Sequence, residues 1–276
     1  MAGEQTFADW VGRVVEAEDS VPEQTARALA ATLGWGPEAR ATAGIAPDGP
    51  LPPLWHWLAF LPEAPAAALA PSGQAPDPLL PPLPGVRIWT GGRLRFHGEL
   101  RIGEPLHRRS EILGIAPEAG GVRVTVAHEI STARNLGVSE VAEHLFAPAP
   151  PAGPATPPRG PAAWRAPLAL DPVRLFRFSA VTFDAERRHY DAPYAAGIGL
   201  PGLAVQDRLL AILLVETARV RREGAWPAAA GFQALRPLCL SERAEILGGA
   251  EADGRQALAV ADGAGACLAA EILWEA

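Results

Sequence analysis

The chain of 276 residues is 49% hydrophobic, which suffices for a packed core in one large domain or in two domains of about 130 residues each. A formal charge of −7 and a pI near 5.4 argue against a nucleic-acid-binding surface. All 24 basic residues are arginine, so the composition excludes a lysine Schiff base and a phosphate-loop lysine.

The cysteines, the N-terminal segment and the apolar runs indicate the cellular compartment of the protein. The two cysteines, Cys239 and Cys267, fit neither a CxxC motif nor a zinc-ligand spacing, and so few thiols indicate a reducing compartment. The N-terminal segment lacks the apolar stretch of a signal peptide, and the longest apolar run, residues 209–215, is too short to span a bilayer. We therefore expect a cytoplasmic protein that has neither a membrane nor a nucleic acid as partner.

The first predicted elements are a helix and a strand. Ser20 and Glu23 form a capping box with a proline between them, and Gly34 ends the following apolar stretch, which predicts a helix over residues 21–33. The dense apolar run at residues 54–61 predicts a strand. Residues 62–84, rich in alanine and proline, predict a long irregular loop.

Strand patterns then continue to the middle of the chain. The predicted strands are residues 87–96, 105–116, 120–132 and 137–146. A Gly-Gly pair at 120–121 predicts a hairpin between the second and third of them. Residues 147–172 hold too many prolines for a central strand or a helix interior, so we expect an extended linker between two domains.

The second half repeats this organisation. An aromatic and β-branched run at residues 175–183 predicts a strand, and the apolar run at 203–220 predicts a buried helix. Further strands are predicted at residues 231–246, 255–261 and 266–274, with turns at 248–254 and 262–265. Each half thus has a helix and several antiparallel strands, which indicates a duplicated α+β unit.

A charged turn at residues 184–194 lies between the predicted strand and the buried helix. Asp184 and His189 are five residues apart and would point about 140° apart on a straight helix, so they converge only if the chain turns between them. A carboxylate and an imidazole that face one gap form an acid–base pair. The plainer alternative has Asp184 as a turn or cap residue, Glu186 paired with Arg187 or Arg188, and His189 as a satisfied core histidine.

The same stretch carries a family resemblance. The sequence FRFSAVTFDAERRHYDAPYA, followed by GLPGLAVQDRLLAILL, resembles the MaoC-like dehydratases and, within them, the double-hotdog branch of mesaconyl-C4-CoA hydratases and type 2 hydroxyacyl-thioester dehydratases. Weaker similarity covers VRIWTGGRLRF, EPLHRRSEI and VTVAHEI. The resemblance implies an α+β double hotdog, with two curved antiparallel sheets that each wrap around a helix.

The resemblance also implies a reaction and its residues. The catalytic Asp and His of the wider family fall on Asp184 and His189, which implies addition or removal of water across a 2-enoyl thioester of coenzyme A, with Asp184 holding the water and His189 moving the proton. The resemblance further implies that a backbone N–H at the start of the long helix would polarise the thioester carbonyl. The implied substrate-binding residues are Gln206, Asp207, Gly202 and Tyr190.

Four positions depart from the pattern of the close branch. That branch has Asn where this chain has Asp184 and His where it has Glu186, and Asp184 restores the dyad of the wider family. Its His-Gly pair at the start of the helix is replaced by Gln206 and Asp207. The Asp207 amide can still donate to an oxyanion, whereas its carboxylate would oppose one if it pointed inward.

The implied organisation is a non-catalytic N-terminal hotdog at residues 1–146, a Pro-rich linker at 147–172 and a catalytic hotdog at 173–276. An acyl-thioester tunnel would lie between the halves, and two such chains could form a homodimer. We expect no cofactor and no metal, because the five other histidines show no metal-ligand spacing. They are His56, His97, His107, His128 and His144.

Two further groups of residues are open to interpretation. Trp55, Trp57 and Trp89 are candidates for the wall of an acyl pocket in the first half. The arginines that end the long helix, Arg219, Arg221 and Arg222, suit the negative end of the helix dipole, and they could also meet the phosphates of coenzyme A. We favour the dipole interpretation.

Two other functions remain compatible with the sequence. A hotdog thioesterase would use the same fold and a carboxylate but would release free coenzyme A. A non-catalytic acyl-CoA-binding subunit is the alternative that Gln206 and Asp207 suggest. The acyl chain that the protein prefers, whether carboxylated or plain, does not follow from the sequence.

Overall fold

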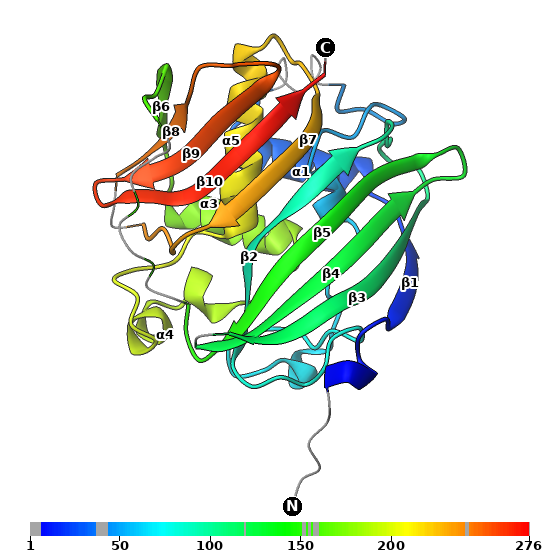
Figure 1. Cartoon of the computed structure of the whole chain (residues 1–276), viewed down its shortest axis with the longest axis vertical. Helices are drawn as coiled ribbons and strands as arrows, with labels where there is room; N and C mark the ends of the chain where they lie inside the picture. Colours follow the sequence, from blue (N-terminus) through cyan, green and yellow to red (C-terminus); the bar gives the residue numbers. More distant parts are fainter. Residues whose placement is uncertain are drawn as a thin grey trace, which may run out of the picture.

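The computed structural model describes residues 7–36, 44–118, 120–150, 153, 156, 160–240 and 243–275. Within these residues, strands from both halves of the chain join into one curved antiparallel sheet (Figure 1). The strands of the first half are β1 Val14–Asp19, β2 Val86–Phe96, β3 Leu106–Glu118, β4 Gly121–Ser131 and β5 Leu136–Ala147. Those of the second half are β6 Trp164–Leu168, β7 Pro227–Ala234, β8 Ala244–Gly248, β9 Arg255–Asp262 and β10 Gly265–Trp274.

The order of the strands reveals a duplication. The sheet runs β1-β3-β4-β5-β2-β7-β10-β9-β8-β6, so each half places its own first, third, fourth, fifth and second strands in the same order. The two halves meet through their second strands, β2 and β7, which pair antiparallel. Two copies of one unit thus join edge to edge, and neither copy leaves that edge exposed.

The α-helices are α1 Glu23–Leu33, α3 Pro172–Val181, α4 Ala192–Gly197 and α5 Asp207–Arg221. The long helix α5 lies against β8, β9 and β10, behind the left part of the sheet in Figure 1. It is buried on nearly every side, including the whole run Leu209–Val215, as expected for a helix that is apolar all round. It forms the centre of the core of the second half.

The first half has no such helix within its described residues. Its one described α-helix, α1, packs against α3 of the second half. In place of a long helix, the first half has the segment 44–85, which contains no α-helix and no regular strand. Its helical turns are two short 3-10 turns at Trp55–Leu58 and Ala66–Ala68. Helix α5 covers one face of the sheet in the second half. No described long helix covers the corresponding face of the first half.

Most sequence predictions of elements are confirmed. The helix predicted at residues 21–33 is α1, and Gly34 ends it in a left-handed conformation with φ 91°. The predicted capping box is wrong, because the helix begins at Glu23 with Pro22 as its N-cap and without a side-chain cap. The strands β2 to β5, the long helix and the turns at 248–254 and 262–265 lie where the sequence predicts them, whereas β1 was not predicted. The hairpin is also present, with β4 starting at Gly121 and pairing with β3.

Three predictions of elements are wrong. Residues 54–61 form the 3-10 turn Trp55–Leu58 rather than a strand, because Pro52 and Pro53 precede it and all four of its residues are buried. Residues 175–183 lie largely in α3, since the side chain of Asp171 caps its first turn at 2.7 Å and a proline occupies the first helical position. Residues 231–246 are divided between β7 and β8.

The Pro-rich segment expected as a linker holds one element that the sequence did not predict. Trp164–Leu168 forms β6 at the edge of the sheet, paired with β8. Pro167 is tolerated there because an edge strand needs to donate hydrogen bonds on one side only. Several other residues of this segment lie outside the described part of the chain.

The junction between the halves provides a test of the fold. Gly91 lies at a bulge of β2 with φ 138°, and a Cβ added there would lie 2.2 Å from the carbonyl oxygen of Phe232 on β7. We expect Gly91→Ala to lower the free energy of unfolding by about 2–4 kcal/mol, because both the backbone strain and the clash fall on the β2–β7 pairing. Chemical denaturation measures this change.

Gly114→Ala on β3 is the matched control, because a Cβ at Gly114 meets no atom within 4 Å. It should change the stability by less than about 0.5 kcal/mol. Equal effects of the two substitutions would show that the junction at Gly91 is not a critical contact.

Candidate active site

The charged turn predicted from the sequence is a sharp elbow in the structure. Helix α3 ends at Val181, and Phe183 then takes a left-handed conformation with φ 52°, which is unusual for a residue with a side chain. The backbone N–H of Asp184 donates to Ser179, which folds the chain back against α3. A 3-10 turn at Arg187–His189 follows, so the chain makes the turn that Asp184 and His189 need in order to converge.

The two side chains are close to each other. The Nε2 atom of His189 lies 3.8 Å from Oδ2 of Asp184. The other oxygen of Asp184 accepts a hydrogen bond from the backbone N–H of Glu186 at 2.9 Å, so Asp184 is a turn residue, as the plainer alternative predicts. That hydrogen bond fixes the carboxyl group and leaves Oδ2 turned toward the imidazole.

Hydrogen bonds determine the tautomer of His189. Its Nδ1 lies 2.7 Å from the carbonyl oxygen of Ala204, and since a carbonyl can only accept, Nδ1 carries the proton. Nε2 is then the unprotonated nitrogen, and Nε of Arg188 donates to it at 3.3 Å. Burial lowers the pKa of His189, and the charge of Arg188 lowers it further, so the ring is neutral near pH 7.

A second carboxylate faces the same imidazole. Oε2 of Glu186 lies 3.9 Å from Nε2 of His189 and 2.9 Å from Nε of Arg188. Burial by itself would raise the pKa of Glu186, but Arg188 and His189 hold it below its ordinary value. Of the two arginines considered from the sequence, Arg188 is thus the partner of Glu186, while Arg187 pairs with Asp191.

The start of α5 completes this side of the site. Gln206 is 3% exposed, and its side-chain amide donates to the carbonyl of Leu175 at 3.1 Å and to the hydroxyl of Ser179 at 2.9 Å. It therefore fastens the beginning of α5 to α3. Burial raises the pKa of Asp207 to about 6, with Glu186 raising it and Arg188 lowering it. The first backbone N–H groups of α5, at Asp207 and Arg208, have no acceptor within the helix.

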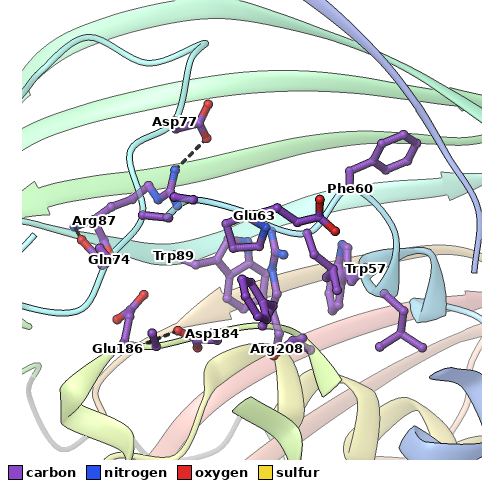
Figure 2. Close-up of a pocket in the computed structure, with 18 of the residues that line it drawn as sticks. Trp57, Phe60, Glu63, Gln74, Asp77, Arg87, Trp89, Asp184, Glu186 and Arg208 are labelled. Atoms are coloured by element: carbon purple, nitrogen blue, oxygen red, sulfur yellow. Dashed lines mark hydrogen bonds and ion pairs between the residues drawn. The ribbon is translucent and has the colours of Figure 1, made fainter. Parts of the chain in front are cut away.

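These groups border a cavity of about 1100 Å³ that extends between the two halves of the molecule (Figure 2). From the second half it is lined by the elbow and the start of α5. From the first half it is lined by the face of β2–β5 that no long helix covers, and by the segment 56–80. Two of the three candidate tryptophans, Trp57 and Trp89, line it, whereas Trp55 is fully buried against Trp35.

The two remaining predicted binding residues differ in their relation to the cavity. Tyr190 is 51% exposed at the edge of the cavity, and its hydroxyl donates to the carbonyl of Ala185 at 3.1 Å. Gly202 is not among the residues that line the cavity. The structure therefore groups Asp184, His189, Gln206 and Asp207, and leaves Gly202 in the connection that leads to α5.

Sequence reasoning missed the polar wall of the first half. Glu140 on β5 is 4% exposed, and its Oε2 accepts a hydrogen bond from Nε1 of Trp57 at 3.1 Å and lies 3.5 Å from Nε2 of His56. Burial would raise the pKa of Glu140, but His56 and His128 lower it to about 2. No local motif connects these residues, which are brought together by the sheet and by the segment that crosses it.

Comparisons with known proteins identify the family. A sequence profile of hydroxyacyl-thioester dehydratase type 2 matches residues 54–240. Over 221 residues the chain is 41% identical to the mesaconyl-C(4)-CoA hydratase of Chloroflexus aurantiacus. The matched region covers 76% of this chain and 77% of the relative. The chain belongs to the type 2 hydroxyacyl-thioester dehydratase family.

Solved structures agree on the fold. A MaoC-like dehydratase from Phytophthora capsici matches with a TM-score of 0.72 at 10% identity, covering 96% of this chain and 95% of that one. A double-hotdog protein of Mycobacterium tuberculosis matches with a TM-score of 0.55 at 16% identity, covering 96% of each chain. The predicted α+β double hotdog and the resemblance to MaoC-like dehydratases are thus confirmed, and the family makes the chain a hydro-lyase of hydroxyacyl thioesters.

The other features considered from the sequence lie away from the cavity. The guanidinium groups of Arg219, Arg221 and Arg222 each stack on a tryptophan, and none of these arginines lines the cavity, which favours a structural role at the end of α5. No helix in the described part of the chain is long and apolar enough to cross a membrane. Among the same residues, no group of three His, Cys, Asp or Glu side chains is arranged to hold a metal ion.

The raised pKa of Asp207 predicts how stability depends on pH. Its pKa in the folded protein, about 6, exceeds the ordinary 3.8, so the stability that its protonation contributes is complete below about pH 4 and is lost as the pH rises through 6. We expect Asp207→Asn to be more stable than the wild type at pH 8, by about 1–2 kcal/mol after allowance for partial solvent exposure, and to lose this advantage at pH 4. Denaturation midpoints at the two pH values measure the difference.

Asp191→Asn is the control with the opposite sign. The pKa of Asp191 is lowered by a backbone hydrogen bond from Tyr194 and by the side chain of Arg187. This substitution should therefore reduce stability at pH 8 more than at pH 4. If both variants respond to pH in the same direction, the Asp207 carboxyl is not held in the buried environment described.

Proposed function

We propose that the chain catalyses the reversible hydration of a 2-enoyl-CoA thioester, with Asp184 and His189 as the acid–base pair. The observation that carries the proposal is the unprotonated Nε2 of a buried, neutral His189, 3.8 Å from a carboxylate oxygen of Asp184, at the wall of a cavity large enough for an acyl thioester. Both atoms are close enough to each other to hydrogen-bond one water molecule.

In the proposed reaction, His189 carries one proton from the water molecule to the α-carbon of the substrate. Asp184 orients the water, and Nε2 of His189 takes one of its protons while the oxygen bonds to the β-carbon of the enoyl group. The imidazolium then returns the proton to the α-carbon, so the two elements of water end on adjacent carbons. Asp184 stabilises the positive charge on the ring between these steps. Dehydration follows the same path in reverse.

The thioester carbonyl needs a donor during these steps, because negative charge develops on its oxygen. The free backbone N–H groups at the start of α5, at Asp207 and Arg208, are suited to this task. The Asp207 carboxyl opposes the developing charge when ionised, and burial partly relieves this conflict by raising the pKa of Asp207 to about 6.

The proposed substrate is a short branched enoyl-CoA like mesaconyl-C4-CoA. The support for it is the 41% identity to the hydratase that is named for this thioester. In mesaconyl-C4-CoA the β-carbon bears a methyl group and a free carboxylate. Trp57 and Trp89, whose rings are 6.1 Å apart, offer an apolar wall to the methyl group.

The division of labour between the halves is part of the proposal. Residues 173–276 supply the acid–base pair, residues 1–146 supply the opposite wall of the cavity without a dyad of their own, and residues 147–172 connect them. This arrangement agrees with the absence of a long helix from the described residues of the first half. Assembly into a homodimer and a cytoplasmic location remain predictions.

The test is a hydration assay on purified protein with mesaconyl-C4-CoA, crotonyl-CoA and a longer enoyl-CoA. Loss of the enoyl-thioester absorbance and the mass of the product measure hydration. We expect His189→Gln to lower kcat by about 10²–10⁴-fold, the usual contribution of a general acid–base residue, and Asp184→Asn to lower it in the same sense. Trapping of free thiol in the same samples separates hydration from thioester hydrolysis.

His107→Gln serves as the control, because His107 is a partly exposed histidine of β3 that does not line the cavity. It should retain the wild-type rate. A His189→Gln variant with wild-type turnover would refute the proposed dyad. Release of coenzyme A without hydration would instead favour a thioesterase.

A further inference from the structure

Two arginines of the cavity wall lack a carboxylate partner. Arg87 forms an ion pair with Asp77 at 2.7 Å, and Arg188 forms one with Glu186. For Arg108 on β3 and Arg208 in the first turn of α5, no ion pair or hydrogen bond of the guanidinium occurs within the described part of the chain. Burial lowers the pKa of both groups, although an arginine remains charged. Two guanidinium groups thus face the cavity with unused hydrogen-bond donors.

Aromatic rings hold both guanidinium groups by their flat faces. The centre of the Arg208 guanidinium lies 5.1 Å from the ring centroid of Trp57, and that of Arg108 lies 4.4 Å from the ring centroid of Phe60. Figure 2 shows Arg208 between Trp57 and Trp89, on the same side of the cavity as Asp184. Stacking occupies the face of a guanidinium and leaves the N–H groups at its edge free to bind an anion.

The carboxylates near the two arginines have other partners or lie beyond ion-pair distance of them. Glu140 acts on both arginines, and its Oε2 is already bonded to Trp57. Asp77 and Asp19 also act on Arg108, and Asp184 and Glu186 also act on Arg208, but none of these carboxylates forms an ion pair with either arginine. The nearby His128 and His144 are neutral at pH 7, because burial lowers the pKa of His128 to about 4 and that of His144 well below its ordinary value. Asp77 and Glu186 are engaged by Arg87 and Arg188, and Asp184 faces His189. Neither Arg108 nor Arg208 therefore has an ion-pair partner of its own in the described part of the chain, and the edges of both guanidinium groups remain available to a ligand.

We propose that Arg208, assisted by Arg108, binds a free carboxylate on the acyl part of the substrate and so selects enoyl thioesters of dicarboxylic acids. This inference rests on the proposed function and identifies the residues that recognise its substrate. A guanidinium binds a carboxylate through paired N–H groups, which gives orientation as well as affinity. Because Arg208 follows the proposed oxyanion donor Asp207 directly in the chain, a carboxylate on the β-carbon is the anion within its reach.

The phosphates of coenzyme A are the other possible source of an anion. The pantetheine arm separates them from the thioester, so a guanidinium beside the dyad meets the acyl end and not the nucleotide. Experiments can distinguish the two sources directly, because free coenzyme A carries the phosphates without the acyl group, and a free dicarboxylic acid carries the carboxylate without the phosphates.

The first experiment compares kcat/KM of Arg208→Met on mesaconyl-C4-CoA and on crotonyl-CoA, which lacks the carboxylate. We expect a loss of about 100-fold on the first and a change of less than about 3-fold on the second, because only the charged substrate loses its partner. Arg208→Lys should recover part of the loss, and Arg108→Met should show a smaller loss of the same kind. Equal losses on both substrates, or no loss on either, would overturn the inference.

Arg109→Met is the matched control on the same strand. Arg109 follows Arg108 on β3, does not line the cavity, and forms an ion pair with Glu111 at 2.8 Å. Because successive residues of a strand point to opposite faces, this substitution removes an arginine without touching the cavity wall. It should leave both kcat/KM values unchanged.

The second experiment measures binding without turnover, through the rise of the melting temperature on addition of free mesaconate, crotonate or coenzyme A. We expect mesaconate to stabilise the wild type and Arg109→Met but not Arg208→Met, and coenzyme A to stabilise all three alike. If Arg208→Met loses the response to coenzyme A instead, the arginine binds phosphate and the inference is wrong.

The two proposals can fail separately. If mesaconate binds in an Arg208-dependent way while no thioester is hydrated, the hydratase proposal fails and the carboxylate site stands. If hydration depends on His189 while Arg208→Met leaves both the substrate preference and mesaconate binding unchanged, the reverse holds.

Discussion

One hydrogen bond determines what the elbow can do, namely the 2.7 Å contact between Nδ1 of His189 and the carbonyl of Ala204. It places the proton on Nδ1 and the lone pair on Nε2, which is the atom that faces Asp184. It also ties the elbow to the segment that leads into α5. That segment is fixed in turn by a bridge between Ala204 and Cys239 and by a hydrogen bond from Val205 to Leu238. The connection between β7 and β8 therefore positions the imidazole from outside the elbow.

A second constraint is the asymmetry between two halves that share one strand order. In the second half α5 fills the concave face of β8–β10 with apolar side chains, which gives a rigid support for the elbow. In the first half the corresponding face carries polar groups such as Ser110, His128 and Glu140, and these line the cavity. The two copies of one unit thus differ, because a long helix covers the face of one copy and the described residues of the other hold no such helix, and the cavity lies between these unlike walls.

Much of the fold and part of the site could be predicted from the sequence, because their signals are local. Alternating strands, the apolar helix and the five-residue spacing of Asp184 and His189 are patterns within single segments. The helix α3 was missed because its aromatic composition was given more weight than the capping signal of Asp171 and Pro172. The polar wall was missed for a different reason: Glu140, His56 and Trp57 are up to 84 residues apart and meet only through tertiary structure.

The departures at Gln206 and Asp207 become intelligible through their surroundings. Gln206 takes on a structural role, because its amide joins the start of α5 to α3 by two hydrogen bonds to Leu175 and Ser179. Asp207 places a carboxyl where the proposed mechanism develops negative charge, yet Arg188 on the elbow acts on that carboxyl and on Glu186 together. One buried guanidinium thus moderates two carboxyl groups while its Nε donates to the imidazole. The charge balance of the elbow therefore depends on Arg188 as much as on the dyad, and a site with an acidic residue at the start of α5 requires such a cation beside it.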